Sequence, residues 1–239
     1  MISFVIPTKN EEKVIGKTLQ AISEYSGAHE VIVSDGNSSD RTVAIAKERG
    51  ASVVPHLGTK RQTISEGRNA GAAAARGEWL VFLDSDAHVP DPNAFFAKAI
   101  AAFSADPSLV ALTCSLRVLP ELETAMDRIV FGVMDLIYVF LNNVVGFGGA
   151  GGEFQMVRRD AFEKIGGFNP ALVAAEDNDL FQRLAKVGRT RLDRSLVAYH
   201  TGRRAHAIGW PRLLCQWFSN YVSIVFLRRS ASAEWTEIR

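Results

Sequence analysis

Short apolar runs alternate with amphipathic stretches over the first 90 residues of the chain. Four runs have the composition of buried strands, at residues 3–6, 30–34, 52–54 and 79–83. Three stretches between them repeat apolar residues at helical spacing, at residues 14–22, 42–49 and 61–75. Strands that alternate with helices predict right-handed crossovers, which build a mainly parallel sheet with helices on its faces.

The second half of the chain is less regular. Its pattern predicts strands at residues 109–118, 154–157 and 196–199, an irregular apolar helix at 121–145, and a helix at 176–187. We therefore predict one α/β domain over residues 1–205, with a nucleotide-binding half at 1–90 and an acceptor and catalytic half at 91–205. An amphipathic helix and a tail follow at residues 206–239.

Polar clusters follow three of the predicted strands. They are Pro-Thr-Lys-Asn-Glu at residues 7–11, Asp-Gly-Asn-Ser-Ser-Asp at 35–40 and Asp-Ser-Asp at 84–86. In sheets of this kind, ligands bind beyond the carboxyl ends of the strands. We therefore expect the three clusters to converge on one crevice and form a site.

Composition and charge narrow the class of protein. The chain has 239 residues, of which 47% are hydrophobic, enough for one large domain. The net charge of +1 leaves no general electrostatic footprint for nucleic acid, although residues 200–239 carry six arginines against two glutamates. Two cysteines are too few for a disulfide framework. No signal-peptide pattern precedes the first strand, so we expect a cytoplasmic protein.

Five sequence blocks occur in a meaningful order. They are VIPTKNEE, VIVSDGNSSDRT, GRNAGAAAARGEWLVFLDSDAHVP, GGEFQMVRRDAFEKIGGFNP and EDNDLFQRL. Over residues 2–205 this series resembles the family-two glycosyltransferases of GT-A fold. The resemblance implies an inverting transferase of hexosyltransferase type. Such an enzyme moves a sugar from a UDP- or GDP-sugar to a hydroxyl or lipid-phosphate acceptor.

The chemistry of this reaction explains a two-aspartate motif. Breaking the bond between the anomeric carbon and the diphosphate places negative charge on the leaving group, which a divalent cation stabilises. Mg²⁺ and Mn²⁺ prefer oxygen ligands, usually one or two carboxylates with phosphates and water. We expect Asp86 to bind the metal, and the resemblance implies that Asp84, beside Ser85, faces the donor. In isolation, Asp-x-Asp is more often a simple turn.

The resemblance assigns the first two strand ends to the nucleoside. Asp35 is expected to accept hydrogen bonds from the base, with Thr8 and Glu11 completing the pocket beside Pro7 and Asn10.

Three basic side chains complete the expected donor site. Arg68, on the same predicted helical face as Arg61, is expected to reach the base or the diphosphate; a solvated arginine is the alternative. Arg203 is expected to cover the diphosphate. His200 is a candidate metal ligand, or a hydrogen-bonded structural histidine.

The resemblance assigns the catalytic base to Asp177, with Glu176 helping to hold the acceptor. A base in this position contributes typically ~10²–10⁴-fold. Both residues open a predicted helix, whose dipole favours negative charge, so we expect the dipole to keep Asp177 ionised. The plain alternative is that the pair only stabilises the helix.

Two hydrophobic segments bear on membrane contact. Residues 129–145 are interrupted by Asp135, Asn142 and Asn143, and we interpret them as too short and too polar for a span. Residues 210–229 repeat apolar residues at helical spacing with arginines nearby. This segment either packs on the domain or lies on the inner face of a membrane, where a lipid-linked acceptor would fit.

Alternative functions remain open from the sequence. Asp84 and Asp86 also fit the nucleophile and general acid of a haloacid-dehalogenase-like phosphohydrolase, although that motif normally ends the first strand of the fold. A non-catalytic sugar-nucleotide binding module would bind a nucleotide without turnover. A nucleotidyltransferase is disfavoured, because no glycine-rich phosphate loop follows the first strand.

Overall fold

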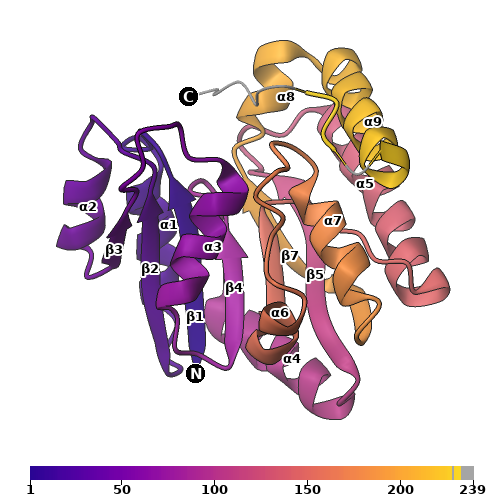
Figure 1. Cartoon of the computed structure of the whole chain (residues 1–239), viewed down its shortest axis with the longest axis horizontal. Helices are drawn as coiled ribbons and strands as arrows, with labels where there is room; N and C mark the ends of the chain where they lie inside the picture. Colours follow the sequence, from indigo (N-terminus) through magenta and orange to yellow (C-terminus); the bar gives the residue numbers. More distant parts are fainter. Residues whose placement is uncertain (228, 233–239) are drawn as a thin grey trace.

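The computed structural model describes residues 1–227 and 229–232, which form one seven-stranded sheet flanked by helices (Figure 1). The strands are β1 (Ile2–Thr8), β2 (His29–Asp35), β3 (Ser52–Pro55), β4 (Trp79–Leu83), β5 (Leu109–Val118), β6 (Phe154–Arg158) and β7 (Arg189–His200). The helices are α1 (Ile15–Ser23), α2 (Thr42–Glu48), α3 (Ile64–Ala74), α4 (Pro92–Ala105), α5 (Ala125–Val139), the π-helix η1 (Phe140–Val145), α6 (Arg159–Lys164), α7 (Glu176–Leu184), α8 (Arg203–Ile208) and α9 (Trp210–Leu227).

The spatial order of the strands is β3-β2-β1-β4-β6-β5-β7. Neighbouring strands run parallel except β6, which is antiparallel to both β4 and β5. The predicted α/β fold with a mainly parallel sheet is therefore confirmed. The carboxyl ends of β1, β2 and β4 lie at one edge of the sheet, where the three polar clusters meet.

Helices cover both faces of the sheet because strand side chains alternate between them. In β4, Val81 and Leu83 pack into the core cluster that holds α1, α4 and α5, whereas Leu80 and Phe82 pack against α3, α6 and α7. The run at 79–83 is apolar throughout for this reason, as expected of a strand buried on both faces.

Some predicted element boundaries were wrong. The helix predicted at 61–75 begins only at Ile64, capped by Thr63 and Glu66, so Arg61 lies outside it and shares no helical face with Arg68. The region 121–145 forms α5, which starts after a capping box of Thr124 and Asp127, and then widens into η1. The short strand predicted at 196–199 is the end of the long β7.

Helix α5 is apolar on two faces. Its outer face exposes Met126, Ile129, Val133, Leu136 and, continuing into η1, Phe140 and Val144. Asp135 is buried instead, where it accepts hydrogen bonds from Ser115 and Arg117. Among the described residues, one stretch, Ala125–Val145, is long and apolar enough to cross a membrane by length and composition alone, a test that soluble core helices also pass.

The segment after α9 folds back onto the loop that precedes α7. Ser230 accepts hydrogen bonds from the amides of Val173 and Ala174 at 3.1 and 3.2 Å. Asn220 of α9 and Ser232 exchange two hydrogen bonds. These contacts tie α9 to the chain immediately before Glu176.

Candidate active site

A cavity of about 1010 Å³ opens at the carboxyl edge of the sheet. Its wall combines β-strand ends from the first half of the chain with α5, α7, α8 and α9 from the second. The predicted site residues in this wall are Pro7, Thr8, Glu11, Arg68, Asp84, Ser85, Asp86, Glu176, Asp177, His200 and Arg203. The described lining leaves out Asn10 and Asp35.

Arg68 joins the two halves of the site. Its side chain is completely buried, and its guanidinium donates to Asp84 at 2.9 Å, to Glu176 at 2.8 Å and to the carbonyl of Gly152 at 2.8 Å. The guanidinium carbon also lies 5.2 Å from the ring centre of Phe168. Arg68 is therefore not a solvated arginine. Its side chain is held in place, because both of its terminal nitrogens donate to protein acceptors. Contact with base or diphosphate stays a prediction.

Asp84 and Asp86 directly follow β4 and line the cavity together with Glu153, in a part of the wall that we call the acidic crevice. Burial raises the pKa of Asp84 to about 7 against the opposing effect of Arg68, and the neighbouring Glu153 and Asp86 add to the rise. Asp86 accepts hydrogen bonds from the hydroxyl and the amide of Thr201. The carboxyl groups of Asp84, Asp86 and Glu153 therefore lie within electrostatic range of one another.

Arg203 lies over the same crevice. Its guanidinium forms a two-point ion pair with Glu11, at 2.7 and 2.9 Å, and its Nε lies 3.5 Å from Asp86. Two residues predicted to bind the donor thus bind each other in this structure. Arg203 is partly exposed and Glu11 is buried, so the predicted contact of Arg203 with a diphosphate requires this ion pair to open.

The ends of β1 and β2 carry buried oxygen atoms that lack a partner among the described residues. They are Thr8 Oγ1, Ser34 Oγ and Asp35 Oδ1. The other oxygen of Asp35 accepts from the amide of Ser38 at 3.0 Å. Asn10, at φ 53°, accepts from the amide of Ser39 and ties the loops after the two strands together. Unsatisfied buried acceptors usually await a ligand or water.

His200 ends β7 in the cavity wall, packed edge-on against Phe131. Its Nδ1 accepts from the amide of Gly202 at 3.2 Å, so the neutral ring carries its proton on Nε2. Nε2 is buried without a partner among the described residues. In this tautomer Nε2 carries a proton and cannot bind a metal, so the predicted ligand role of His200 requires loss of the Gly202 contact.

Asp177 lies in the first turn of α7, after Ala175 in the left-handed conformation at φ 56°. One of its oxygens accepts from the amide of Asn178 at 2.8 Å. Burial raises the pKa of Asp177 well above its usual range; Glu176 raises it further, and Arg68 only partly opposes the shift. Burial thus opposes the expected effect of the helix dipole on Asp177, and its ionisation stays a prediction.

Two polar residues of the site were missed from the sequence. Glu153 follows the glycine-rich turn and raises the pKa of both Asp84 and Asp177; the block GGEF in which it lies was the available signal. Tyr138 of α5 hydrogen-bonds Asn178, and burial beside Asp177 raises the pKa of its hydroxyl. No sequence signal distinguished Tyr138, because α5 is apolar on both faces.

The donor set fits a hard divalent cation. Asp84 and Asp86 supply carboxylate oxygens at a cavity wall, the ligands that Mg²⁺ and Mn²⁺ prefer. Within the described residues, no group of three or more His, Cys, Asp or Glu side chains is arranged to hold a metal alone. A site of this kind is completed by phosphate oxygens and water.

Known proteins resemble this chain in sequence and in fold. The chain is 28% identical to a beta-monoglucosyldiacylglycerol synthase of Synechocystis over 90% of its own length and 49% of that protein, so it spans about half of this relative. Its fold is similar to that of a mannosyltransferase from Pyrobaculum calidifontis in complex with GDP-Man and Mn²⁺ (TM-score 0.75, 21% identity, 94% of this chain and 63% of that one).

A second solved structure of similar fold is glucosyl-3-phosphoglycerate synthase from Mycobacterium tuberculosis in complex with Mn²⁺, UDP and glucosyl-3-phosphoglycerate (TM-score 0.61, 19% identity, 95% of this chain and 79% of that one). The model of glycosyl transferase family 2 matches residues 3–166, more than half of the chain. On this match, and with the predicted fold confirmed, the chain belongs to glycosyl transferase family 2.

Proposed function

We propose that this chain is an inverting glycosyltransferase that moves a sugar from a UDP- or GDP-sugar to a hydroxyl or lipid-phosphate acceptor. The observation that carries the proposal is the pair of contacts made by Arg68. They bring the acidic end of β4 and the first turn of α7 into the wall of one cavity. The residues expected to bind the donor and those expected to bind the acceptor therefore line the same cavity.

The relatives support the choice of donor. One solved structure of similar fold contains GDP-Man and another contains UDP, both with Mn²⁺. The buried oxygens of Thr8 and Asp35, which lack a partner in the described part of the chain, suit the N–H groups of a nucleobase. A diphosphate bound beside Asp86 would lie within reach of Arg203, whose ion pair with Glu11 would then open.

In the proposed mechanism, Asp86 holds Mg²⁺ or Mn²⁺ and Asp84 faces the donor. The bound metal supplies Lewis-acid stabilisation of the negative charge on the leaving diphosphate. Asp177, with Glu176 beside it, accepts the proton of the acceptor hydroxyl. The acceptor oxygen attacks the anomeric carbon from the face opposite the diphosphate, and the bond between that carbon and the diphosphate breaks. The raised pKa of Asp177 suits this step, since it makes the ionised carboxylate a stronger base than an ordinary aspartate.

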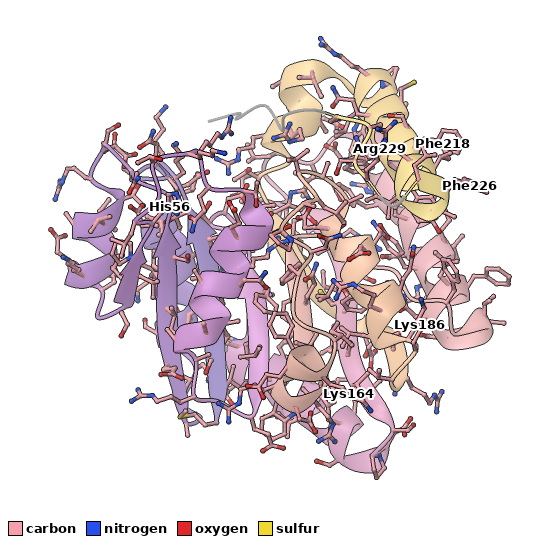
Figure 2. The ribbon with its side chains drawn as sticks, in the orientation of Figure 1. His56, Lys164, Lys186, Phe218, Phe226 and Arg229 are labelled. Atoms are coloured by element: carbon pink, nitrogen blue, oxygen red, sulfur yellow. The ribbon has the colours of Figure 1, made fainter. Side chains whose placement is uncertain are left out.

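We also propose that residues 210–229 contact the inner face of a membrane. Phe218 and Phe226 of α9 are 72% and 77% exposed, and both lie on the outer side of that helix, with Arg229 on the same part of the molecule (Figure 2). Exposed aromatic side chains beside arginine are typical of interfacial helices. Residue 228 of this segment lies outside the described residues.

Calorimetric titration with UDP, GDP and their sugars, with and without Mn²⁺, tests the proposal. Wild type should bind one nucleotide in a metal-dependent way, and Asp86→Asn should lose this binding while keeping its fold. Asp91→Asn is the matched control, because Asp91 caps α4 from the surface and asparagine caps equally well.

The titration, together with assays of phosphate release and of sugar transfer, separates the alternatives. Binding to no nucleotide under any metal would overturn the transferase. Release of phosphate from simple esters would support the phosphohydrolase, although Asp84 ends the fourth strand and is paired with Arg68. Donor binding without turnover, whatever acceptor is supplied, would support the binding module.

A further inference from the structure

We propose that the acceptor is a lipid alcohol, with its hydrocarbon chain between α5 and α9 and its hydroxyl beside Asp177. This inference rests on the proposed function and names the acceptor class for that same site. It is carried by the part of the cavity that a nucleotide sugar leaves unexplained.

The cavity has a polar part and an apolar part. Strand ends and α7 form the polar part, whereas α5 and α9 contribute mainly aromatic and aliphatic side chains. The principal apolar residues are Phe131, Met134, Ile137 and Leu141 from α5 and η1, and Leu213, Leu214 and Trp217 from α9. A volume of about 1010 Å³ lies at the upper end of the range of ~300–1,000 Å³ that holds a small ligand. A nucleotide sugar bound in the polar part would therefore leave the apolar part of the cavity wall uncovered.

The spacing along α5 shows that this wall is a second face of the helix. Residues 131, 134, 138 and 141 face the cavity at intervals of three and four, whereas residues 129, 133, 136 and 140 are exposed on the outside. A helix that is apolar on both faces needs a partner on each. A hydrocarbon chain in the cavity would cover the inner face.

Tyr138 lies at the boundary between the apolar part of the cavity and the proposed catalytic residues. Its hydroxyl hydrogen-bonds Asn178 and lies within electrostatic range of Asp177, Glu153 and Tyr221. A chain bound along α5 therefore ends next to the proposed base. The charged groups around this point are carboxylates, and both terminal nitrogens of the nearby Arg68 are held by protein acceptors. An uncharged hydroxyl fits such surroundings, whereas a phosphate would be repelled.

The walls of the apolar part are fixed relative to Asp177. Asp127 of α5 accepts hydrogen bonds from His206 of α8 and Trp210 of α9, both at 2.8 Å. Ser230 then ties the end of α9 to the loop before α7. A chain held between α5 and α9 would consequently present its end group in a defined position.

Three acceptors that share a glycerol unit test this inference: dioleoylglycerol, dioleoyl phosphatidate and free glycerol, each supplied in detergent micelles with the nucleotide sugar that the enzyme binds. We expect transfer to dioleoylglycerol and little to the other two. Ile137→Phe narrows the apolar part and should lower transfer to dioleoylglycerol about 10-fold or more, since pocket contacts of methylene size are worth ~10–200-fold. Leu136→Phe adds the same bulk outside the cavity and should keep the wild-type rate.

A binding measurement keeps failure of this inference apart from failure of the proposed function. Diacylglycerol with brominated chains should quench tryptophan fluorescence, and Trp217→Phe should remove part of that quenching, whether or not a donor binds. Absent quenching, equal transfer to glycerol, or preference for phosphatidate would each overturn the inference while leaving metal-dependent donor binding intact. Quenching without any donor binding would support the lipid site and overturn the transferase.

Discussion

Replacement of Arg68 by methionine removes one charge from the centre of the molecule and keeps much of the side-chain length. Arg68 is completely buried and forms ion pairs of 2.9 Å with Asp84 and 2.8 Å with Glu176. Its loss leaves the buried carboxyl group of Glu176 and the half-buried carboxyl group of Asp84 without their cation. Breaking a buried ion pair by removing one partner costs ~3–5 kcal/mol, so we expect the free energy of unfolding to fall by about that amount.

The surface offers a matched comparison. Arg76 follows α3, pairs with Glu30 at 2.9 Å and is 79% exposed. Since exposed ion pairs contribute ~0.2–1 kcal/mol, Arg76→Met should cost about 1 kcal/mol or less. Both variants remove the same charge and differ mainly in burial.

Urea denaturation of both variants and wild type, followed by circular dichroism, measures these differences. Calorimetric titration with the nucleotide sugar should show weakened donor binding for Arg68→Met alone, because Asp84 loses the group that positions it. A cost below about 1 kcal/mol for Arg68→Met with intact donor binding would refute the reasoning. It would mean that the two carboxyl groups need no buried cation.

Three further predictions concern separate parts of the structure. Asp177→Asn should keep donor binding and lower turnover by at least ~10²-fold. In the wild-type pH–rate profile, the acidic limb should lie above the usual range of aspartate pKa values, because Asp177 must be ionised and burial raises its pKa. Burial opposes ionisation of Asp127, but its hydrogen bonds lower its pKa from 3.8 to about 2. Asp127 should therefore contribute ~2 kcal/mol of stability above about pH 4, lost as the pH falls towards 2; urea midpoints of Asp127→Asn and wild type should converge over this range, and a constant gap would contradict it. Gly148→Ala should lower the melting temperature, since the residue has φ 85° and a Cβ would strike the backbone of Phe181; an unchanged melting temperature would count against this contact.

The sequence predicted the elements whose signal is local. The first four strands and the polar clusters that follow three of them are set by apolar runs of strand length and by the residues that end them, and the structure confirms their order. The position of β6 was not predictable in this way. Its antiparallel insertion between β4 and β5 depends on contacts across the sheet rather than on the composition of residues 154–158.

The electrostatics of the site also lay beyond the sequence. Arg68 meets partners at positions 84, 152 and 176, and no spacing along one helix shows that these positions converge on it. The pKa of Asp177 rises through burial by the packed second half, which a helix-dipole argument omits. Tyr138 could not be singled out because the inner and outer faces of α5 are equally apolar.

The strand order has a consequence for the synthesis of the protein. Strands β1 to β4 pair with one another and can assemble as they leave the ribosome, whereas both neighbours of β5 are encoded after it. At ~5–20 residues per second, β5 waits for β6 for a time of the order of seconds. Its ten residues, LVALTCSLRV, are nearly all buried in the finished sheet and form the kind of segment that aggregates when exposed. The yield of folded protein in a cell should therefore depend on chaperones that shield this strand during translation.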